Sequence, residues 1–364
     1  MKKRILLLGE VNSVHFRKWV FEFSDLFDLA VFSFSPVESS QLRKEYEDNG
    51  VLIFTPEFAA SSKMSYFLRF NLLKSAYRSF IPDLVHAHYA TSYGLFGALL
   101  KPEKFLVSVW GSDVFQFPRK SLVHRRLLKF VFRRAHAVLS TSKVMANEIS
   151  LYTDKKIHIT PFGVDTDLFR PSSKKSETFV VGTVKGLSKI YGIDYLIKGF
   201  AQFLVVCPSA ECHIYGKGPD ELALKKLAED LKIDSSVKFM GHVNHKVVPE
   251  VLSTFDVFCA LSREESFGVA VLEASACSLP VVVSRAPGLK EVVKDKETGY
   301  IIDPSNSEET KSVLSRLYNN ESERESMGQK GREFVVNNYS WRRSSEIMQN
   351  IYNELLNDQL KSKF

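Results

Sequence analysis

Residues Asp256 to Val283 read DVFCALSREESFGVAVLEASACSLPVVV and contain the most informative pattern of the chain. The apolar run at residues 257–261 predicts a buried strand, and residues 281–283 predict a second one. Between them we expect a polar loop that ends at Gly268 and a short helix over residues 269–277. Strand, loop, helix and strand in this order predict a parallel α/β sheet.

Glu273 is a single carboxylate among apolar neighbours in this predicted helix. An unpaired buried carboxylate costs several kcal/mol, so we expect Glu273 to be paired, to lie at the helix edge, or to receive a ligand. The backbone N–H groups of Ser266, Phe267 and Gly268 precede the helix and predict an anion site, which Gly268 allows a ligand to approach closely. Glu265 lies beside that site. A phosphate with a sugar on each side would fit these features.

The sequence from Glu265 to Glu273, ESFGVAVLE, resembles the Glu-x7-Glu signature of the retaining family 4 glycosyltransferases of GT-B fold. The similarity continues through residues 274–283 and 299–301. It implies two Rossmann-like domains facing each other across a cleft, with no metal or other cofactor required. It also implies that Glu265 holds the donor sugar, that Glu273 holds the ribose, and that the segment from Ser266 to Val269 contacts the donor. The alternative is an ordinary helix cap with a surface glutamate.

The activity that the resemblance implies is transfer of a sugar from a nucleotide diphosphate-sugar to an acceptor hydroxyl, in cell-surface polysaccharide or glycolipid synthesis. Three alternatives remain open at this point. A nucleotide-sugar 2-epimerase has a similar architecture, and so does a phosphorylase, which would need a pyridoxal-phosphate lysine. A non-catalytic subunit that binds nucleotide-sugars is the third. We see no carboxylate pair spaced for a metal ion.

The whole chain has 364 residues, of which 45% are hydrophobic, which suffices for two domains with separate cores. The longest apolar runs have the length of strands, and residues 5–8 are too short for a signal-peptide core, so we expect a first strand there. The cysteines are surrounded by apolar residues and lack metal-type spacing, which indicates a reducing, cytoplasmic compartment; they are Cys207, Cys212, Cys259 and Cys277.

The first half alternates apolar runs with helical stretches, which is typical of a parallel sheet. We expect strands at residues 5–8, 29–34, 51–54, 84–87, 105–109, 137–140 and 157–160. Ligands bind beyond the carboxyl ends of such strands. The loop after the first strand has a single glycine, Gly9, which excludes a nicotinamide fingerprint but still lets a donor approach.

His88 and Asp113 follow the fourth and fifth predicted strands. Residues 110–113 resemble the His-Gly-x-Asp motif of the family, but this chain has Trp110 where many members carry the histidine. We therefore expect His88 or Asp113 to face the acceptor hydroxyl. The alternative for His88 is a histidine that satisfies hydrogen bonds at the strand end.

The second half begins its own alternation at residues 179–184 and continues with three loops that resemble the family. The first carries Lys185 and Lys189, which we expect to stabilise the departing diphosphate, although the usual last lysine position is Tyr191 here. The alternative is two surface lysines. The second loop is Gly-x-Gly-Pro with Gly216 and Gly218. The third, with His242 and Val243, resembles the loop whose backbone holds the nucleotide base in the family, so we expect it to contact the donor.

A linker rich in Pro, Gly, Ser and Lys, at residues 160–165 and 169–175, marks the domain boundary. We expect an acceptor-binding domain at residues 1–167 and a donor-binding domain at residues 168–341. The final helix begins at Trp341 with apolar residues at four-residue spacing. In relatives this helix returns to the first domain, so we assign residues 342–364 there.

Positive charge is concentrated in the first half. Residues 1–170 hold 24 Lys and Arg against 16 Asp and Glu, a net charge of +8, whereas the whole chain has +7. The segments 63–80 and 119–134 combine cations with aromatic and aliphatic residues, which favours a peripheral site on the inner face of an anionic membrane, where a lipid-linked acceptor would be held. The alternatives are ordinary solvated helices and a soluble saccharide acceptor. No motif supports nucleic-acid binding.

Overall fold

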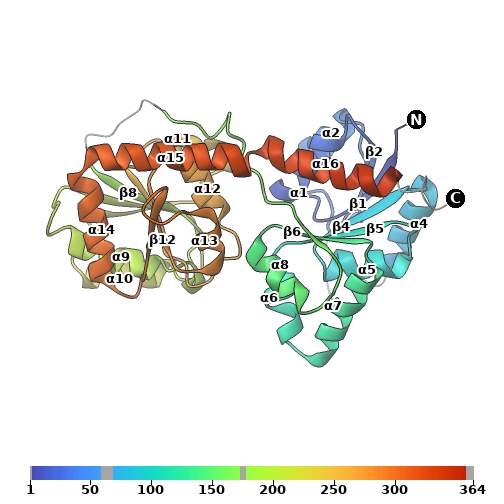
Figure 1. Cartoon of the computed structure of the whole chain (residues 1–364), viewed down its shortest axis with the longest axis horizontal. Helices are drawn as coiled ribbons and strands as arrows, with labels where there is room; N and C mark the ends of the chain where they lie inside the picture. The colour runs from blue at the N-terminus through green and yellow to red at the C-terminus, as the bar shows by residue number, and fades with distance from the viewer. Residues whose placement is uncertain (1, 59–68, 173–177, 358–364) are drawn as a thin grey trace. The chain divides into compact units, whose positions relative to one another are not determined.

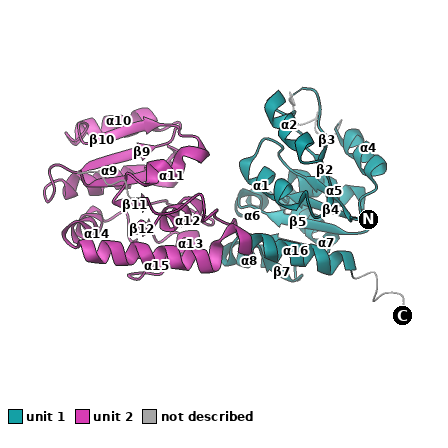
Figure 2. Ribbon diagram, turned by 90° about the horizontal axis from the view of Figure 1, so that it is seen from above, with its two compact units in different colours: residues 1–161, 344–364 teal, residues 162–343 magenta. Residues whose placement is uncertain are grey.

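The computed structural model describes residues 2–58, 69–172 and 178–357, and the chain divides into two compact units (Figure 2). The first unit contains residues 1–161 and 344–364, and the second contains residues 162–343. Each unit is a parallel sheet with helices packed against it (Figure 1). The boundaries predicted from the sequence lie at 167/168 and 341/342, and the prediction assigns the last helix to the first domain.

The sheet of the first unit has the order β3-β2-β1-β4-β5-β6-β7, and every neighbouring pair is parallel. Its strands are β1 Arg4–Leu8, β2 Asp28–Phe32, β3 Leu52–Phe54, β4 Leu84–His88, β5 Phe105–Val109, β6 Ala137–Ser140 and β7 Ile157–Ile159. The strand order reverses between β1 and β4, and the crevice beyond the carboxyl ends at such a point is where ligands bind in open α/β sheets. The loops that follow β1 and β4 therefore define the candidate site of this unit.

Some helices of the first unit begin where a serine side chain accepts a backbone N–H group, as Ser13, Ser121 and Ser142 do. They are α1 Val14–Phe23, α2 Ser40–Asp48, α4 Phe70–Phe80, α5 Ser92–Leu100, α6 Ser112–Phe115, η1 Phe117–Arg119, α7 Leu122–Arg134 and α8 Lys143–Ser150. The last helix, α16 Trp341–Asn357, crosses the boundary between the units in sequence, and its buried Tyr352 packs in the first one.

The sheet of the second unit has the order β10-β9-β8-β11-β12-β13, again all parallel. Its strands are β8 Val180–Val184, β9 Glu211–Tyr215, β10 Val237–Gly241, β11 Val257–Ala260, β12 Val281–Ser284 and β13 Gly299–Ile302. The order reverses between β8 and β11. Lys185 follows the first of these strands and residues 261–268 follow the second, so both predicted anion-binding segments lie at the switch point.

The helices of the second unit are η2 Lys189–Tyr191, α9 Ile193–Phe203, α10 Glu221–Asp230, η3 His245–Val247, α11 Val248–Leu252, α12 Val269–Ala276, α13 Pro287–Val292, α14 Ser307–Asn319 and α15 Glu321–Tyr339. Helix α12 is short and almost wholly buried, and it packs against α15. A Cβ on Gly328 of α15 would come within 2.0 Å of the carbonyl oxygen of Ser278, so a glycine is needed for this close approach.

The predicted strands agree with the observed ones to within two residues at each end, and two of them, 105–109 and 137–140, agree at both. The predicted helix 269–277 ends one residue earlier, at Ala276. Residues 63–68 of the first basic segment lie outside the described residues. In the part of the chain that the structure describes, no helix combines the length and apolarity that a membrane span requires.

Candidate functional site

The centre of the site in the second unit is an ion pair between Lys185 and Glu265. Lys185 follows β8, Glu265 lies in the loop after β11, and Lys185 Nζ lies 2.6 Å from Glu265 Oε2. The two side chains are 11% and 14% exposed. The ammonium also lies 5.2 Å from the centre of the Tyr191 ring. The switch point thus places a fixed cation beside a fixed carboxylate, where a ligand with both phosphate and hydroxyl groups would be recognised.

Lys189 begins the short helix η2, and its side chain is exposed. Arg263 holds this turn in place: Nη1 donates to the Lys189 carbonyl oxygen at 2.7 Å, and its backbone N–H donates to Ile190 O at 2.7 Å. The same guanidinium makes two hydrogen bonds of 2.7 Å to Asp194. Burial raises the pKa of Asp194, but the hydrogen bonds and charge of Arg263 bring it below its ordinary value.

Gly216 and Gly218 allow the loop after β9 to lie directly against the loop after β8. Gly216 has φ +142°, and a Cβ there would lie 1.8 Å from Lys185 O. A Cβ on Gly218 would lie 2.1 Å from Leu187 O. The two glycines therefore support the backbone that carries Lys185.

Gly268 forms the N-cap of α12 with φ +95°, a conformation that favours glycine. The loop before it is fastened by a hydrogen bond from Gly288 N to Glu265 O at 3.0 Å. Phe267 is 3% exposed, and its ring packs beside those of Phe162 and Tyr339. The buried phenylalanine ring anchors the loop. The backbone of the loop is therefore the part that a ligand can contact.

Glu273 is 9% exposed and has a protein partner. His245 Nε2 lies 2.7 Å from Glu273 Oε1, and the His245 ring lies 5.4 Å from that of Phe169. In the same loop, His242 is exposed and Val243 packs partly into the core around α12. The sequence predicts His242 and Val243 as site residues but not His245, although the need of Glu273 for a partner is a signal.

In the first unit, His88 ends β4 and is 2% exposed. Its ring lies 4.1 Å from that of His86, 5.1 Å from Phe16 and 5.5 Å from Trp110. Within the described residues, neither ring nitrogen has a hydrogen-bond partner. Burial lowers the pKa of His88 to about 3, so the imidazole is neutral at physiological pH. A buried polar group without a partner is rare and marks a site for a ligand or a bound water.

His86, two residues before His88 on β4, has a hydrogen-bond partner at each ring nitrogen. Its Nδ1 lies 2.7 Å from the Tyr352 hydroxyl on α16, and its Nε2 lies 2.8 Å from Ser108 Oγ. Burial is the main cause that lowers the pKa of His86. The two histidines therefore differ: both ring nitrogens of His86 are hydrogen-bonded, whereas those of His88 can still bind a ligand or a water.

Asp113 is completely buried and accepts three backbone N–H groups: Ala90 at 2.9 Å, Gly111 at 2.8 Å, and Trp110 at 3.2 Å. Burial raises the pKa of Asp113 to about 6, and these hydrogen bonds oppose the rise. The carboxylate thereby ties the loop after β4 to the loop after β5. Tyr89, in the first of these loops, has φ +94°, a strained conformation of the kind that gathers at functional sites.

Gly9 follows β1 at the same switch point. A Cβ on Gly9 would lie 2.3 Å from the Phe16 ring, so the glycine permits α1 to pack its first turn onto the loop. Phe16 in turn contacts His88. Gly9 thus shapes the surroundings of His88.

Two family models match the chain: the one described as glycosyl transferases group 1 matches residues 164–334, and the one described as glycosyl transferase 4-like matches residues 4–142. The chain belongs to the glycosyltransferases of GT-B fold. It is 23% identical over 300 residues to N-acetyl-alpha-D-glucosaminyl L-malate synthase of Bacillus anthracis, which covers 77% of each chain.

Solved glycosyltransferase structures share the fold across nearly the full length. Sucrose-phosphate synthase from Thermosynechococcus elongatus has a TM-score of 0.81 at 17% identity, covering 97% of this chain and 99% of the other. Anabaena Alr3699/HepE in complex with UDP and glucose has a TM-score of 0.79 at 18% identity, with the same coverage. The recognised family, the fold class and the enzyme class inferred from the sequence are confirmed.

The predicted residues of this glycosyltransferase fall into two groups, one in each unit. Those in the second unit gather around the carboxyl ends of β8 and β11, with Lys185 in contact with Glu265 and with Glu273 on the helix that follows. Those in the first unit gather around the carboxyl ends of β4 and β5. Besides His245, the sequence analysis missed Arg263, whose signal is weak because a polar residue in a loop is ordinary.

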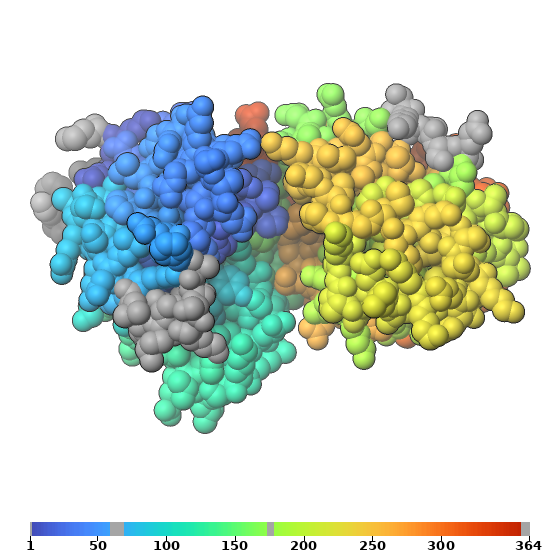
Figure 3. All heavy atoms as spheres, turned by 180° about the vertical axis from the view of Figure 1, so that it is seen from behind, coloured from blue at the N-terminus to red at the C-terminus, as the bar shows by residue number. Residues whose placement is uncertain are grey.

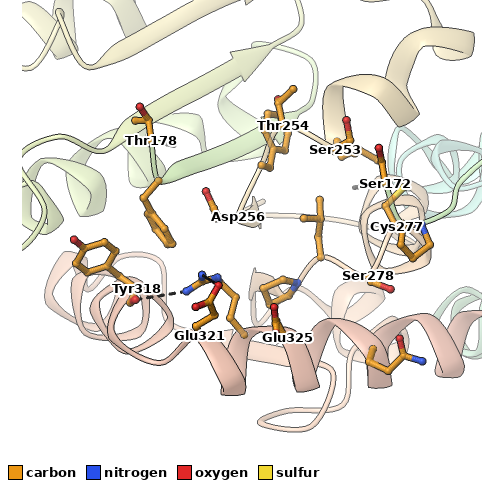
Figure 4. A pocket seen from close by; sticks show the side chains of 18 of the residues that line it. Ser172, Thr178, Ser253, Thr254, Asp256, Cys277, Ser278, Tyr318, Glu321 and Glu325 are labelled. Carbon is orange, nitrogen blue, oxygen red and sulfur yellow. Dashed lines mark hydrogen bonds and ion pairs between the residues drawn. The ribbon is translucent and has the colours of Figure 1, made fainter. Parts of the chain in front are cut away.

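A cavity of about 550 Å³ in the second unit lies at the other edge of the sheet, where Phe179 precedes β8 and Asp256 precedes β11 (Figure 4). Two of its charged side chains are bound within the protein. Asp256 Oδ2 accepts Val180 N at 2.8 Å, and Arg324 donates to Leu317 O at 2.7 Å. We therefore place the chemistry of the glycosyltransferase at the carboxyl edge and not in this cavity.

Proposed function

We propose that this glycosyltransferase binds a nucleotide diphosphate-sugar in the second unit and transfers the sugar, with retention of configuration, to a saccharide or lipid-linked acceptor. The observation that carries the proposal is the Lys185–Glu265 pair at the switch point, with Glu273 eight residues further on. Anabaena Alr3699/HepE, whose fold this chain shares, was solved with UDP and glucose. That structure supports a donor of this class.

In this proposal each donor-binding group has a distinct task. Glu265 accepts hydrogen bonds from hydroxyls of the transferred sugar, and Lys185 and Lys189 stabilise the diphosphate as negative charge develops on it. Glu273 accepts from the ribose, while the backbone from Ser266 to Val269 lies against the phosphates. His242 and Val243 belong to the loop that holds the base. Gly216 and Gly218 keep Lys185 in place.

The acceptor is bound by the first unit. The acceptor oxygen forms a bond to the anomeric carbon as the bond to the diphosphate breaks, and the leaving phosphate oxygen takes the acceptor proton. This mechanism does not need a histidine at Trp110. We propose that neutral His88 accepts a hydrogen bond from the acceptor through an otherwise unpartnered nitrogen, and that Gly9 and Asp113 shape this site without touching the reacting atoms.

Thermal shift against UDP, GDP, ADP and CDP tests the donor site, because a ligand that binds the folded state raises its stability. At least one nucleotide should stabilise the protein, and Glu273→Ala should then weaken its binding by roughly 1.5 to 3 kcal/mol in calorimetry, the worth of a hydrogen bond to a charged group. Glu264→Ala changes an exposed side chain in the loop before α12 and should leave nucleotide affinity unchanged. Absence of binding by all four nucleotides would contradict the proposal.

We further propose that the first unit docks on an anionic membrane through the start of α7 (Figure 3). Leu128, Val131 and Phe132 of this helix are buried, so most of its apolar face belongs to the core. Leu122 and Val123, however, are 73% and 61% exposed. Exposed cations flank them in the sequence, at Arg119, Lys120, Arg125, Arg126 and Lys129. Exposed apolar residues among cations fit an interface with anionic lipid.

A further inference from the structure

The hydrogen bond between His245 and Glu273 joins two parts of the second unit that are 28 residues apart in the chain. Glu273 lies on α12, which follows the switch-point loop. His245 begins η3, in the loop after β10, where the Asn244 side chain caps the turn by accepting Lys246 N at 3.0 Å. A single contact of 2.7 Å therefore fastens the loop after β10 to the carboxylate of α12.

The His245 side chain is 44% exposed, and its ring packs against an anchored phenylalanine. The Phe169 ring lies 5.4 Å away, and Phe169 is itself 1% exposed. Arg332 fixes the backbone of this residue, because its Nη1 donates to Phe169 O at 3.1 Å and also to Ala276 O at the end of α12. The histidine thus lies between two groups that are both anchored to the α12 region.

The two oxygens of Glu273 are not equivalent. Oε1 accepts from His245, whereas among the described residues Oε2 has no hydrogen-bond donor. A carboxylate that is 9% exposed needs further donors, since a buried charge is costly when its hydrogen-bonding capacity is unused. Vicinal hydroxyls supply such donors. The histidine also fixes the carboxylate rotamer, so that the open oxygen keeps one direction.

We infer that His245 is the positioning residue that orients Glu273 for the ribose hydroxyls of the donor. This inference rests on the proposed role of Glu273 in donor binding. It goes further because it makes recognition of the ribose depend on the loop after β10, which the proposed function assigns only to the base. His245 acts through Glu273 and does not touch the reacting atoms.

The test compares a nucleoside diphosphate with its 2′,3′-dideoxy form, using whichever of UDP, GDP, ADP and CDP gives the largest thermal shift. Calorimetry yields the ratio of the two dissociation constants for each variant, and a general loss of affinity cancels in this ratio. The wild-type enzyme should prefer the ribose form by roughly tenfold or more. His245→Leu should bring the ratio close to one, and His245→Gln, which keeps an N–H donor, should restore most of it.

Lys246→Leu, which changes an exposed side chain in the same turn, should keep the wild-type ratio. If Glu273→Gln leaves the ratio unchanged, the proposed ribose role of Glu273 fails, and the inference fails with it. If Glu273→Gln removes the preference while His245→Leu preserves it, only the inference is overturned. Should His245→Leu bind neither ligand, His245→Asn, whose amide is too short for the same contact, gives the ratio in its place.

Discussion

His88 is a single residue whose buried polar side chain lacks the hydrogen bonds that a neighbouring histidine makes. The side chain is 2% exposed, and neither nitrogen has a hydrogen-bond partner within the described residues, whereas His86 beside it has two. His86 contacts Ser108 and Tyr352, whereas His88 is enclosed by the rings of Phe16 and Trp110. Nothing in these contacts stabilises a protonated imidazole.

His88 should therefore make the protein less stable in acid. Burial lowers its pKa to about 3, while the unfolded chain titrates near 6.5, so the unfolded state binds a proton first as the pH falls. The stability present above pH 6.5 should decline by about 1.4 kcal/mol per pH unit from this residue alone. His88→Phe should lessen the loss of Tm between pH 7.5 and 5, and should reduce sugar transfer at pH 7.5.

Asp113 acts in the opposite direction. Burial raises the pKa of Asp113 to about 6 against an ordinary value of 3.8. The stability that Asp113 contributes to the folded state is therefore full below pH 3.8 and is lost as the pH rises through 6. Because Asp113 is present in both proteins, the comparison of His88→Phe with wild type isolates the histidine. Equal acid sensitivity of the two proteins would show that His88 is protonated in the folded state.

Among the elements, the short helix η2 is held in place by a side chain from the loop after β11. Arg263 donates to the Lys189 carbonyl, pairs twice with Asp194 and lies 4.0 Å from the centre of the Tyr195 ring. A planar guanidinium is suited to this combination, and lysine is not. The position of Lys189 is therefore set by a residue 74 positions away in the chain.

If Lys189 acts on the developing charge of the diphosphate, Lys189→Ala should lower kcat more than it raises KM. Arg263→Leu should have the same kinetic signature and a lower Tm, because it also leaves Asp194 unpaired. In the Lys189→Ala background, Arg263→Leu should lower kcat much less, since the two act through one turn. The double variant Asp194→Asn with Arg263→Leu controls for the unpaired carboxylate. Additive losses of kcat would mean that Arg263 does not act through Lys189.

The sequence predicted the elements better than the contacts between them. Apolar runs such as residues 105–109 are buried on both faces of a parallel sheet, so their boundaries follow from hydrophobicity. The pairing of Lys185 with Glu265 depends on which strands become neighbours, and 80 residues separate the two. His245 was missed for the same reason. Local sequence shows that Glu273 needs a partner, but only the strand order shows which residue supplies it.

At the scale of the molecule, the first half of the chain carries an excess of positive charge. Its net charge of +8 includes exposed cations on α7, a helix whose own sequence contains no acidic residue. Some basic residues are used internally: the Arg125 guanidinium lies over the Tyr152 ring, and that of Arg133 lies over Phe130. The remaining cations are the ones to test for a membrane contact.

Each cation near an anionic surface contributes about 1 kcal/mol, so four together should bind where one does not, and binding should weaken steeply with salt. Flotation with anionic liposomes should show binding at low salt that is lost when four exposed residues are changed to Ser: Lys120, Arg126, Lys129 and Arg134. The double variant Leu122→Ser with Val123→Ser should weaken liposome binding without altering its salt dependence.

A matched control removes four exposed lysines of the second unit: Lys198, Lys226, Lys232 and Lys330. Equal binding to neutral liposomes, or an equal loss in the control, would show that α7 is not the membrane contact and that its charge serves a soluble acidic acceptor or solubility alone.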